Sequence, residues 1–318
     1  MPRCLKPIVA VLILAGCQEP SAPAALVASL GIAPVLAPGT LSGVVAIDNA
    51  RLRLFRAGSE RVLDTTVVFP ADSGSISVVL RVPLKARSER LLLIVELRVA
   101  TQAYYSASQL VELFAEAEGP TPTPRPVVTY VGPGSTAKQL RIAPRDTILS
   151  FGDSFTFRVS ASDSVGGTVD TPLLVWSTLP ALPISTAGML LAPSVRGAVK
   201  LRVFTPAGVG DSTSVRFAPA PALLVLAAGA GQTAQAGSVL PTPFVVQVRG
   251  PDGLGVPGAL VRFRALTAGG SVRDATVVSD DNGLAGTPVT LGPVAGIYGF
   301  EASLPGLPVV VLTATATP

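Results

Sequence analysis

Short segments in which apolar and polar residues alternate with a period of two begin near Leu41 and continue through the rest of the 318-residue chain. Such alternation places every second side chain on one face of a β-strand. Turns rich in glycine, proline and aspartate separate the segments, and no sustained helical period interrupts them. The pattern therefore predicts an all-β fold built from sandwiches.

Histidine is absent from the chain, and its two cysteines are Cys4 and Cys17. Without imidazole the chain can form neither a Ser-His-Asp nor a Cys-His catalytic centre, and it cannot bind zinc through histidine. The formal net charge is +4, and the arginines are spread along the chain. Because a clustered basic footprint is missing, we predict no nucleic-acid partner.

Carboxylates remain candidates for glycoside chemistry, which needs two of them about 5 to 9.5 Å apart. The aspartates that stand beside turn residues are Asp153, Asp163, Asp170, Asp252 and Asp280. An aspartate at a turn accepts hydrogen bonds from backbone amides, which favours a structural role over hydrolysis. We therefore predict a non-enzymatic protein with no catalytic residue, no cofactor and no bound metal.

The N-terminal residues form a leader pattern. Arg3 and Lys6 precede an apolar run over residues 8–14, which is typical of a secretory signal peptide and too short to span a bilayer as a helix. The sequence Leu14-Ala15-Gly16-Cys17 resembles the lipobox of bacterial lipoproteins. This resemblance implies that cleavage removes residues 1–16 and that the Cys17 thiol receives a diacylglycerol. An ordinary signal peptide that contains a cysteine is the alternative.

The lipobox resemblance makes the membrane a partner through lipidated Cys17 and implies a cell-envelope protein. Gln18 follows the cysteine where an aspartate would signal retention, so the resemblance implies an outer-membrane lipoprotein, on the surface or on the periplasmic face. Residues 17–40 are rich in alanine and contain four prolines. Because proline disrupts a regular helix, this segment is predicted to be a tether.

A first sandwich domain is predicted over residues 41–118. Its alternating runs are residues 51–56, 62–69, 75–82, 91–100 and 103–114. Residues 119–136 form a predicted spacer that starts with proline at every second position from Pro120. Such spacing favours an extended, semi-rigid polyproline II segment. A docking peptide for a proline-binding module is the alternative.

A second domain is predicted over residues 137–218. An Ile-x-Pro strand at Ile142, a Gly-Asp turn, a Val-Trp-Ser strand around Trp176 and a Gly-Asp-Ser-Thr hairpin at 210–213 follow one another. This order resembles the bacterial immunoglobulin-like group 2 domain. A lone tryptophan on such a strand is predicted to lie in the core, and a sugar-stacking platform is the alternative.

A third domain is predicted over residues 219–318. It contains Asp-Gly-Leu-Gly-Val-Pro-Gly at 252–258, Asp-Asp-Asn-Gly at 280–283 and Thr-Ala-Thr-Ala at 313–316. This series is similar to the bacterial immunoglobulin-like group 1 domain of the invasin and intimin adhesins. Together the two resemblances imply tandem immunoglobulin-like β-sandwich domains. The side chains predicted to face inward are Phe244, Val246, Val248, Val261 and Phe263.

The oxygen-rich segment 280–283 has two interpretations. It could bind calcium, but the alternating ligands and terminal glutamate of an EF-hand are missing. Asn282-Gly283 is instead typical of a tight turn that needs a positive φ. We therefore predict a hairpin turn here.

The sequence as a whole predicts a lipid-anchored cell-envelope protein that presents immunoglobulin-like domains for adhesion or protein–protein interaction at the bacterial surface. The protein or glycan that it contacts is unknown. The alternative function is a carbohydrate-binding or structural scaffold module of the envelope. For that alternative, Tyr104-Tyr105 is the best stacking candidate, because neighbours on a strand point to opposite faces.

Overall fold

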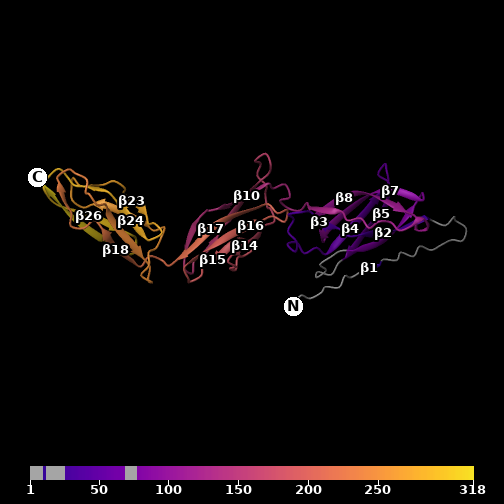
Figure 1. The fold of residues 1–318 in the computed structure, drawn as a ribbon, viewed down its shortest axis with the longest axis horizontal. Coiled ribbons are helices and arrows are strands. Elements are labelled where there is room, and N and C mark those ends of the chain that lie inside the picture. The colour runs from indigo at the N-terminus through magenta and orange to yellow at the C-terminus, as the bar shows by residue number, and fades with distance from the viewer. Residues whose placement is uncertain (1–9, 12–25, 69–76) are drawn as a thin grey trace. The chain divides into compact units, whose positions relative to one another are not determined.

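The computed structural model describes residues 10–11, 26–68 and 77–318, and its regular structure is almost entirely β-strand (Figure 1). Within these ranges the one helix is the short 3-10 helix η1 (Glu116–Glu118), and no helix there is long and apolar enough to cross a membrane. The chain divides into two compact units. One holds Met1–Arg141, Val159–Trp176 and Arg202–Asp211, and the other holds Ile142–Arg158, Ser177–Leu201 and Ser212–Pro318.

Residues 10–11, 26–68 and 77–130 form a sandwich around one apolar core, here called the N-terminal sandwich. Its larger sheet has the strand order β3 (Val35–Leu36), β9 (Val127–Tyr130), β8 (Gln102–Phe114), β7 (Ser88–Val99), β4 (Asn49–Phe55) and β5 (Arg61–Val68). The smaller sheet has the order β1 (Ala10–Val11), β6 (Val78–Leu84) and β2 (Leu26–Ile32). Alternate residues of both sheets are buried against each other, as the period-two pattern predicts.

Strand β2 belongs to this sandwich although its alanine- and proline-rich surroundings predict a tether. Ala28, Leu30 and Ile32 are fully or almost fully buried, and β2 pairs antiparallel with β6 along its whole length. The alternation is hard to see in the sequence because the intervening residues are small. Likewise, β9 lies within the predicted spacer and pairs with β8 and β3. The division into three domains stays a prediction, but strand pairing extends beyond the first domain's predicted bounds.

The middle of the chain contains three small sheets. One has the order β11 (Thr147–Ser150), β17 (Gly210–Ala218), β16 (Gly197–Phe204) and β14 (Val175–Leu179); the others pair β10 (Gln139–Ala143) with β13 (Arg158–Ser162) and β12 (Ser154–Thr156) with β15 (Met189–Leu191). Of the four side chains that alternate through β12 and β13, Phe157 and Ala161 are buried, while Phe155 and Val159 are half-buried.

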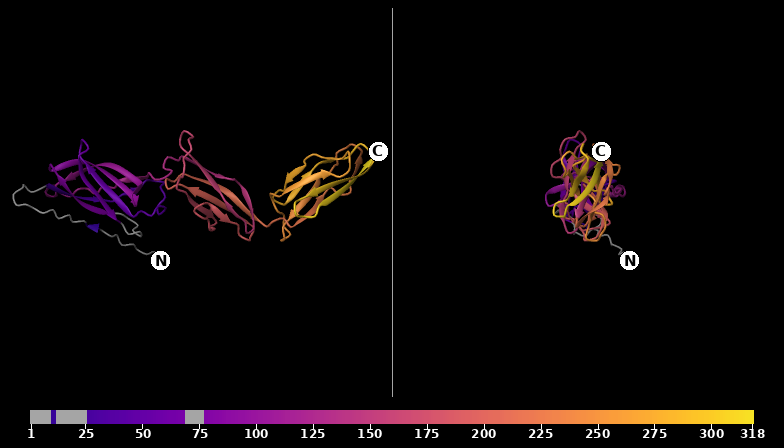
Figure 2. Two further views of the ribbon diagram at one scale, coloured as in Figure 1. Left: turned by 180° about the vertical axis from the view of Figure 1, so that it is seen from behind. Right: turned by 90° about the vertical axis from the view of Figure 1, so that its left-hand side faces the viewer.

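Residues 223–317 form a second sandwich, here called the C-terminal sandwich. One sheet has the order β18 (Leu223–Ala228), β20 (Phe244–Arg249) and β24 (Leu284–Thr287). The other has the order β19 (Thr233–Gln235), β27 (Val310–Thr317), β26 (Gly296–Ser303), β21 (Leu260–Ala265) and β23 (Thr276–Val278), with a short ladder between β22 (Ser271–Val272) and β25 (Val289–Thr290). The yellow strands β26 and β27 can be followed from two further directions in Figure 2.

The core of the C-terminal sandwich confirms the predicted inward face. Phe244, Val246, Val248 and Val261 have no exposed surface, and Phe263 is 3% exposed. The rings of Phe244 and Phe263 meet edge to face across the two sheets, with centroids 5.5 Å apart. This geometry is favoured between aromatic rings. The all-β, tandem-sandwich fold class is therefore confirmed.

Candidate interaction surfaces

The predicted lipidation site, Cys17, lies outside the described residues. The described chain continues at Leu26, the first residue of β2, which is paired with Leu84 of β6. The structure also pairs β1, which lies inside the predicted leader, with β6. In a mature chain that starts at Cys17 this strand would be absent, and the chain would enter the N-terminal sandwich at Leu26, nine residues after Cys17. Lipidation of Cys17 stays a prediction. An anchor on Cys17 would be joined to the end of the sandwich where Leu26 pairs with Leu84.

Three of the five turn aspartates, Asp163, Asp252 and Asp280, accept hydrogen bonds from backbone amides, as the turn interpretation predicts. Asp163 Oδ1 accepts hydrogen bonds from the amides of Val165 and Gly167 at 2.9 and 2.8 Å. Asp280 Oδ1 accepts from the amides of Asn282 and Leu284 at 2.9 and 2.8 Å. This segment is a tight turn but not the predicted hairpin, because it joins β23 of one sheet to β24 of the other. These carboxylates hold turns closed. In the part of the chain that the structure describes, no group of three or more Asp, Glu, Cys or His side chains could hold a metal ion.

Asp252 has a further partner. Arg196 donates to it in a bidentate arrangement, with distances of 2.6 Å from Nε to Oδ2 and 3.0 Å from Nη2 to Oδ1. The hydrogen bond from Arg196 holds the pKa of Asp252 below its ordinary value. An aspartate is ionised at neutral pH in any case, and this pairing extends the ionised range of Asp252 to lower pH.

Two motifs of the predicted third domain meet at one crossing of loops. A side chain on Gly255 would place its Cβ 2.0 Å from the carbonyl oxygen of Asn282, and one on Gly283 would place its Cβ 2.3 Å from the carbonyl oxygen of Val248. Gly283 also has a φ of +74°, and its carbonyl accepts a hydrogen bond from the amide of Val248 at 2.8 Å. The glycines in both motifs are therefore explained by close backbone approach.

Trp176 is half-buried, so the expectation of a core tryptophan is met only in part. It lies on β14, the edge strand of its sheet, two residues before the buried Thr178. Period two puts both side chains on the inward face, but an edge strand has a neighbour on one side only. The alternation of β14 correctly places Trp176 on the inward face. Its indole ring is only half-buried because β14 is an edge strand.

The sequence predicts that the two tyrosines point to opposite faces of β8, but the structure does not separate them in this way. The register of β7 and β8 shifts between them, with Leu97 opposite Tyr105 and Arg98 opposite Ala103, and Tyr104 packs against the same core as Tyr105. Tyr105 is 3% exposed, and its ring meets that of Tyr130 edge to face with centroids 5.6 Å apart. Tyr104 is half-buried and lies 6.5 Å from the same Tyr130 ring. Tyr130 donates through its hydroxyl to the carbonyl of Pro133 at 2.9 Å, and burial raises the pKa of Tyr130. Tyr104 therefore packs against a structural cluster and is only partly free to stack on a sugar.

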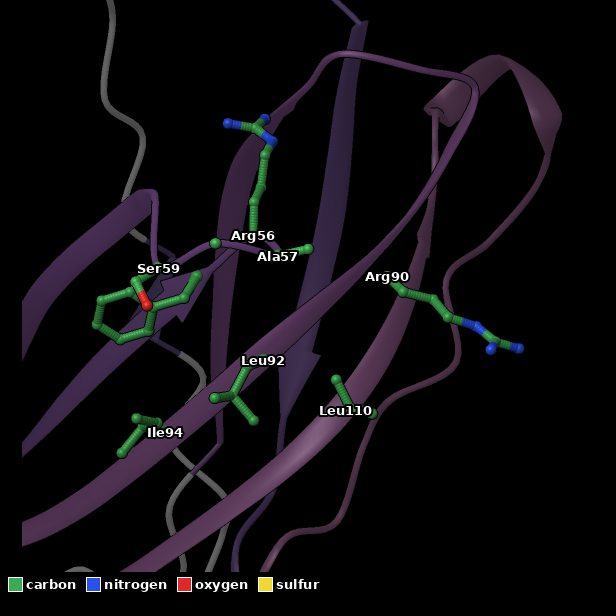
Figure 3. A pocket seen from close by; sticks show the side chains of 9 residues that line it. Arg56, Ala57, Ser59, Arg90, Leu92, Ile94 and Leu110 are labelled. Carbon is green, nitrogen blue, oxygen red and sulfur yellow. The ribbon is translucent and has the colours of Figure 1, made fainter.

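An apolar groove lies on the outer face of the larger N-terminal sheet, the face turned away from β2 and β6. Phe55 of β4 stands opposite Leu92 of β7, and Leu92 stands opposite Leu110 of β8, so three apolar side chains form one row across three strands. Together with Ile94 and the turn 56–59 they line a groove of about 530 Å³ (Figure 3). Leu110 is 69% exposed, so the groove is open to solvent.

Charged side chains border this groove. Arg56 forms ion pairs with Glu60 and Glu89, each at 3.1 Å. Lys85 Nζ donates to both carboxylate oxygens of Glu60, at 2.9 and 2.8 Å, and this hydrogen bonding holds the pKa of Glu60 below its ordinary value. The guanidinium groups of Arg56 and Arg90 point away from Leu92 and Ile94 in Figure 3. The apolar floor therefore has a polar rim.

Ion pairs lie beside the groove on the same face. Arg51 of β4 binds Asp64 of β5 through two hydrogen bonds of 2.8 Å, which hold the pKa of Asp64 below its ordinary value. Arg53 pairs with Glu96 of β7. Paired charges are the usual covering of a solvated sheet face. The row of Phe55, Leu92 and Leu110 thus lies next to paired charges, and no motif in the sequence predicts it. Val68 and Val127 are further exposed apolar side chains on this face.

No protein-family model and no curated protein matches the chain. Among solved structures, an adhesin InvE of Yersinia pseudotuberculosis is 15% identical, with 57% of this chain and 58% of that chain covered and a TM-score of 0.32. Domains 4 and 5 of the S-layer protein SbsC are 13% identical, with 57% and 99% covered and a TM-score of 0.27. The D00-D0 domain of intimin is 11% identical, with 56% and 100% covered and a TM-score of 0.25. Glycoside hydrolases also match, including a β-glucuronidase of Parabacteroides merdae at 13% identity, with 56% and 25% covered and a TM-score of 0.25.

The match to InvE spans little more than half of that adhesin's chain. The fold of the present protein is therefore described from its own strands and cores, which establish tandem all-β sandwiches.

Proposed function

We propose that this chain is a non-enzymatic, lipid-anchored protein of the bacterial cell envelope that presents its sandwiches for adhesion or protein–protein interaction. One observation carries the proposal. The cysteine of Leu14-Ala15-Gly16-Cys17 stands nine residues before the first residue of β2 in a tandem β-sandwich chain. A lipidated cysteine at that position joins the anchor to the folded part by a short segment.

The physical basis of the anchor is the number of acyl chains. One chain gives only marginal membrane binding, with an association constant of about 10⁴ M⁻¹, whereas two or more give stable anchoring. A diacylglycerol on Cys17 supplies two chains. An anchor of this kind holds the protein without any membrane-spanning segment.

The side chains singled out as chemical candidates support presentation rather than catalysis. Asp163 and Asp280 accept backbone hydrogen bonds, and Asp252 binds Arg196. The glycines at 255 and 283 permit a close crossing of loops. All of these residues maintain a scaffold, and scaffolds of this kind offer loops and strand edges to partners.

Exposure of the C-terminal sandwich on intact cells tests presentation at the surface. We expect an epitope tag added after Pro318 to bind antibody on intact cells, and protease added to those cells to remove it. A tag on a known periplasmic protein is the control for envelope integrity. If the tag is reached only after the envelope is permeabilised, the surface role is wrong and the envelope-scaffold alternative takes its place.

A further inference from the structure

In the part of the chain that the structure describes, the apolar groove of the N-terminal sandwich is open to solvent. Its floor is the row of Phe55, Leu92 and Leu110, with Ile94 beside it. Leu110 keeps 69% of its surface exposed. A row of apolar side chains in an open groove, beside the ion pairs of Arg51 and Arg53, is typical of a site that contacts an apolar surface.

In a mature chain that starts at Cys17, and so lacks β1, the groove lies at the end of the sandwich where the chain enters. Leu26, the first residue of β2, pairs with Leu84 of β6. The preceding residue of β6, Pro83, accepts a hydrogen bond from Arg56 Nη2 at 3.0 Å through its carbonyl oxygen. Arg56 in turn lines the groove next to Phe55. A short series of direct contacts therefore connects the entry point of the chain with the apolar floor.

The length of chain before this entry point limits how far the groove can lie from an anchor. Leu26 comes nine residues after Cys17. Because an extended chain spans at most about 3.6 Å per residue, Leu26 stays within about 32 Å of an anchored Cys17. Such a short connection gives the groove a high effective concentration at the membrane, so even a weak contact would be populated.

The charges around the groove do not select an anionic surface. Arg56 is paired with Glu60 and Glu89, and Arg90 stands directly opposite Glu112 in the ladder of β7 and β8. Acidic and basic groups are thus mixed on the rim. Contact through this face would depend on apolar burial and would be little affected by salt.

We infer that this groove is a lipid-docking face, in which Phe55, Leu92, Ile94 and Leu110 contact the acyl region of the membrane that carries the anchor. The inference rests on the proposed lipidation of Cys17. The N-terminal sandwich then rests against the bilayer, and the chain that follows Tyr130 remains free to contact partners.

A fluorescent label at position 110 tests the docking. Processing removes Cys4 and lipidation blocks the Cys17 thiol, so Leu110→Cys places a single reactive thiol in the full mature chain. The lipidated protein is labelled with an environment-sensitive dye and inserted into vesicles of phosphatidylethanolamine and phosphatidylglycerol. Docked residues lie about 5–10 Å inside the headgroup boundary, so brominated acyl chains should quench about half of the emission.

Val165→Cys is the matched control, because Val165 is 88% exposed and lies in a turn outside the N-terminal sandwich. Its dye should stay unquenched. Adding Phe55→Ser to the Leu110→Cys protein should abolish the quenching, while the protein still floats with the vesicles. High salt should leave the quenching unchanged.

The outcomes separate the two proposals. If the protein floats with the vesicles but the dye at position 110 is no more quenched than the dye at 165, the docking face is wrong and the anchor stands. If the protein does not float and Cys17 reacts with the dye, the anchor is wrong, and the docking inference falls with it.

Discussion

Replacing Cys17 with serine should abolish incorporation of a palmitate analogue and release the protein from washed membranes. Cys17 is the one cysteine that remains if processing removes residues 1–16, so it is the only thiol that can carry the diacylglycerol in the mature chain. Loss of both chains of the diacylglycerol removes about 0.8 kcal/mol of membrane affinity for each buried methylene. Radiolabelling or click labelling, followed by carbonate extraction, measures both effects.

Cys4→Ser provides the matched control for this experiment. It removes the other cysteine of the chain, which lies in the predicted leader, and should leave labelling and extraction unchanged. Equal labelling of the wild-type and Cys17→Ser proteins would show that the lipobox interpretation is wrong. Loss of label in Cys4→Ser instead would move the modification to the leader.

Gly283→Ala should destabilise the C-terminal sandwich by about 2–5 kcal/mol, since two costs add. An alanine at a left-handed φ costs about 1–2 kcal/mol, and Gly283 has a φ of +74°. The added Cβ would also lie 2.3 Å from the carbonyl oxygen of Val248 and 2.8 Å from the Cα of Gly255. Overpacking against backbone atoms costs a further 1–3 kcal/mol or so.

Gly253→Ala isolates the first of these costs. Gly253 has a φ of +77°, yet a Cβ added there would meet nothing within 4 Å, so this variant should lose only about 1–2 kcal/mol. Hydrogen exchange followed by mass spectrometry on peptides from β20, β21 and β26 reports the stability of this sandwich separately from the rest of the chain. Equal loss of protection in the two variants would contradict the close crossing of the loops.

The strands that the sequence predicts best are those with long, regular alternation. Residues 51–56 and 103–114 coincide with most of β4 and β8, and the inward face of β20 is the predicted one. Each of these strands alternates apolar side chains with polar or less buried ones. The physical signal is therefore contained in the strand itself and needs no knowledge of its neighbours.

Two features could not be predicted because they depend on neighbouring strands. β2 alternates buried Ala28, Leu30 and Ile32 with small residues in a proline-rich segment, so its local pattern is weak until β6 pairs with it. Half-burial of Trp176 follows from the edge position of β14. Strand order within a sheet is set by tertiary packing, which period-two alternation does not encode.

The apolar groove also could not be predicted from the sequence, because it depends on how neighbouring strands pair. The burial patterns of β4, β7 and β8 put Phe55, Leu92 and Leu110 on the outward face, where a single apolar residue is ordinary. For Leu92 the sequence could not assign a face, because it lies in an unbroken apolar run at 91–95. Only the register between β4, β7 and β8 brings the three into one row. The site therefore emerges from pairing rather than from any motif, whereas the Cys17 site is visible in sequence alone.

The mass of the N-terminal peptide of protein extracted from membranes tests lipid anchoring most directly. We predict that the mature chain starts at Cys17 and that its first peptide carries the mass of a diacylglycerol on the cysteine. A mature chain that starts elsewhere, or an unmodified Cys17 at the N-terminus, would contradict the lipid-anchored account.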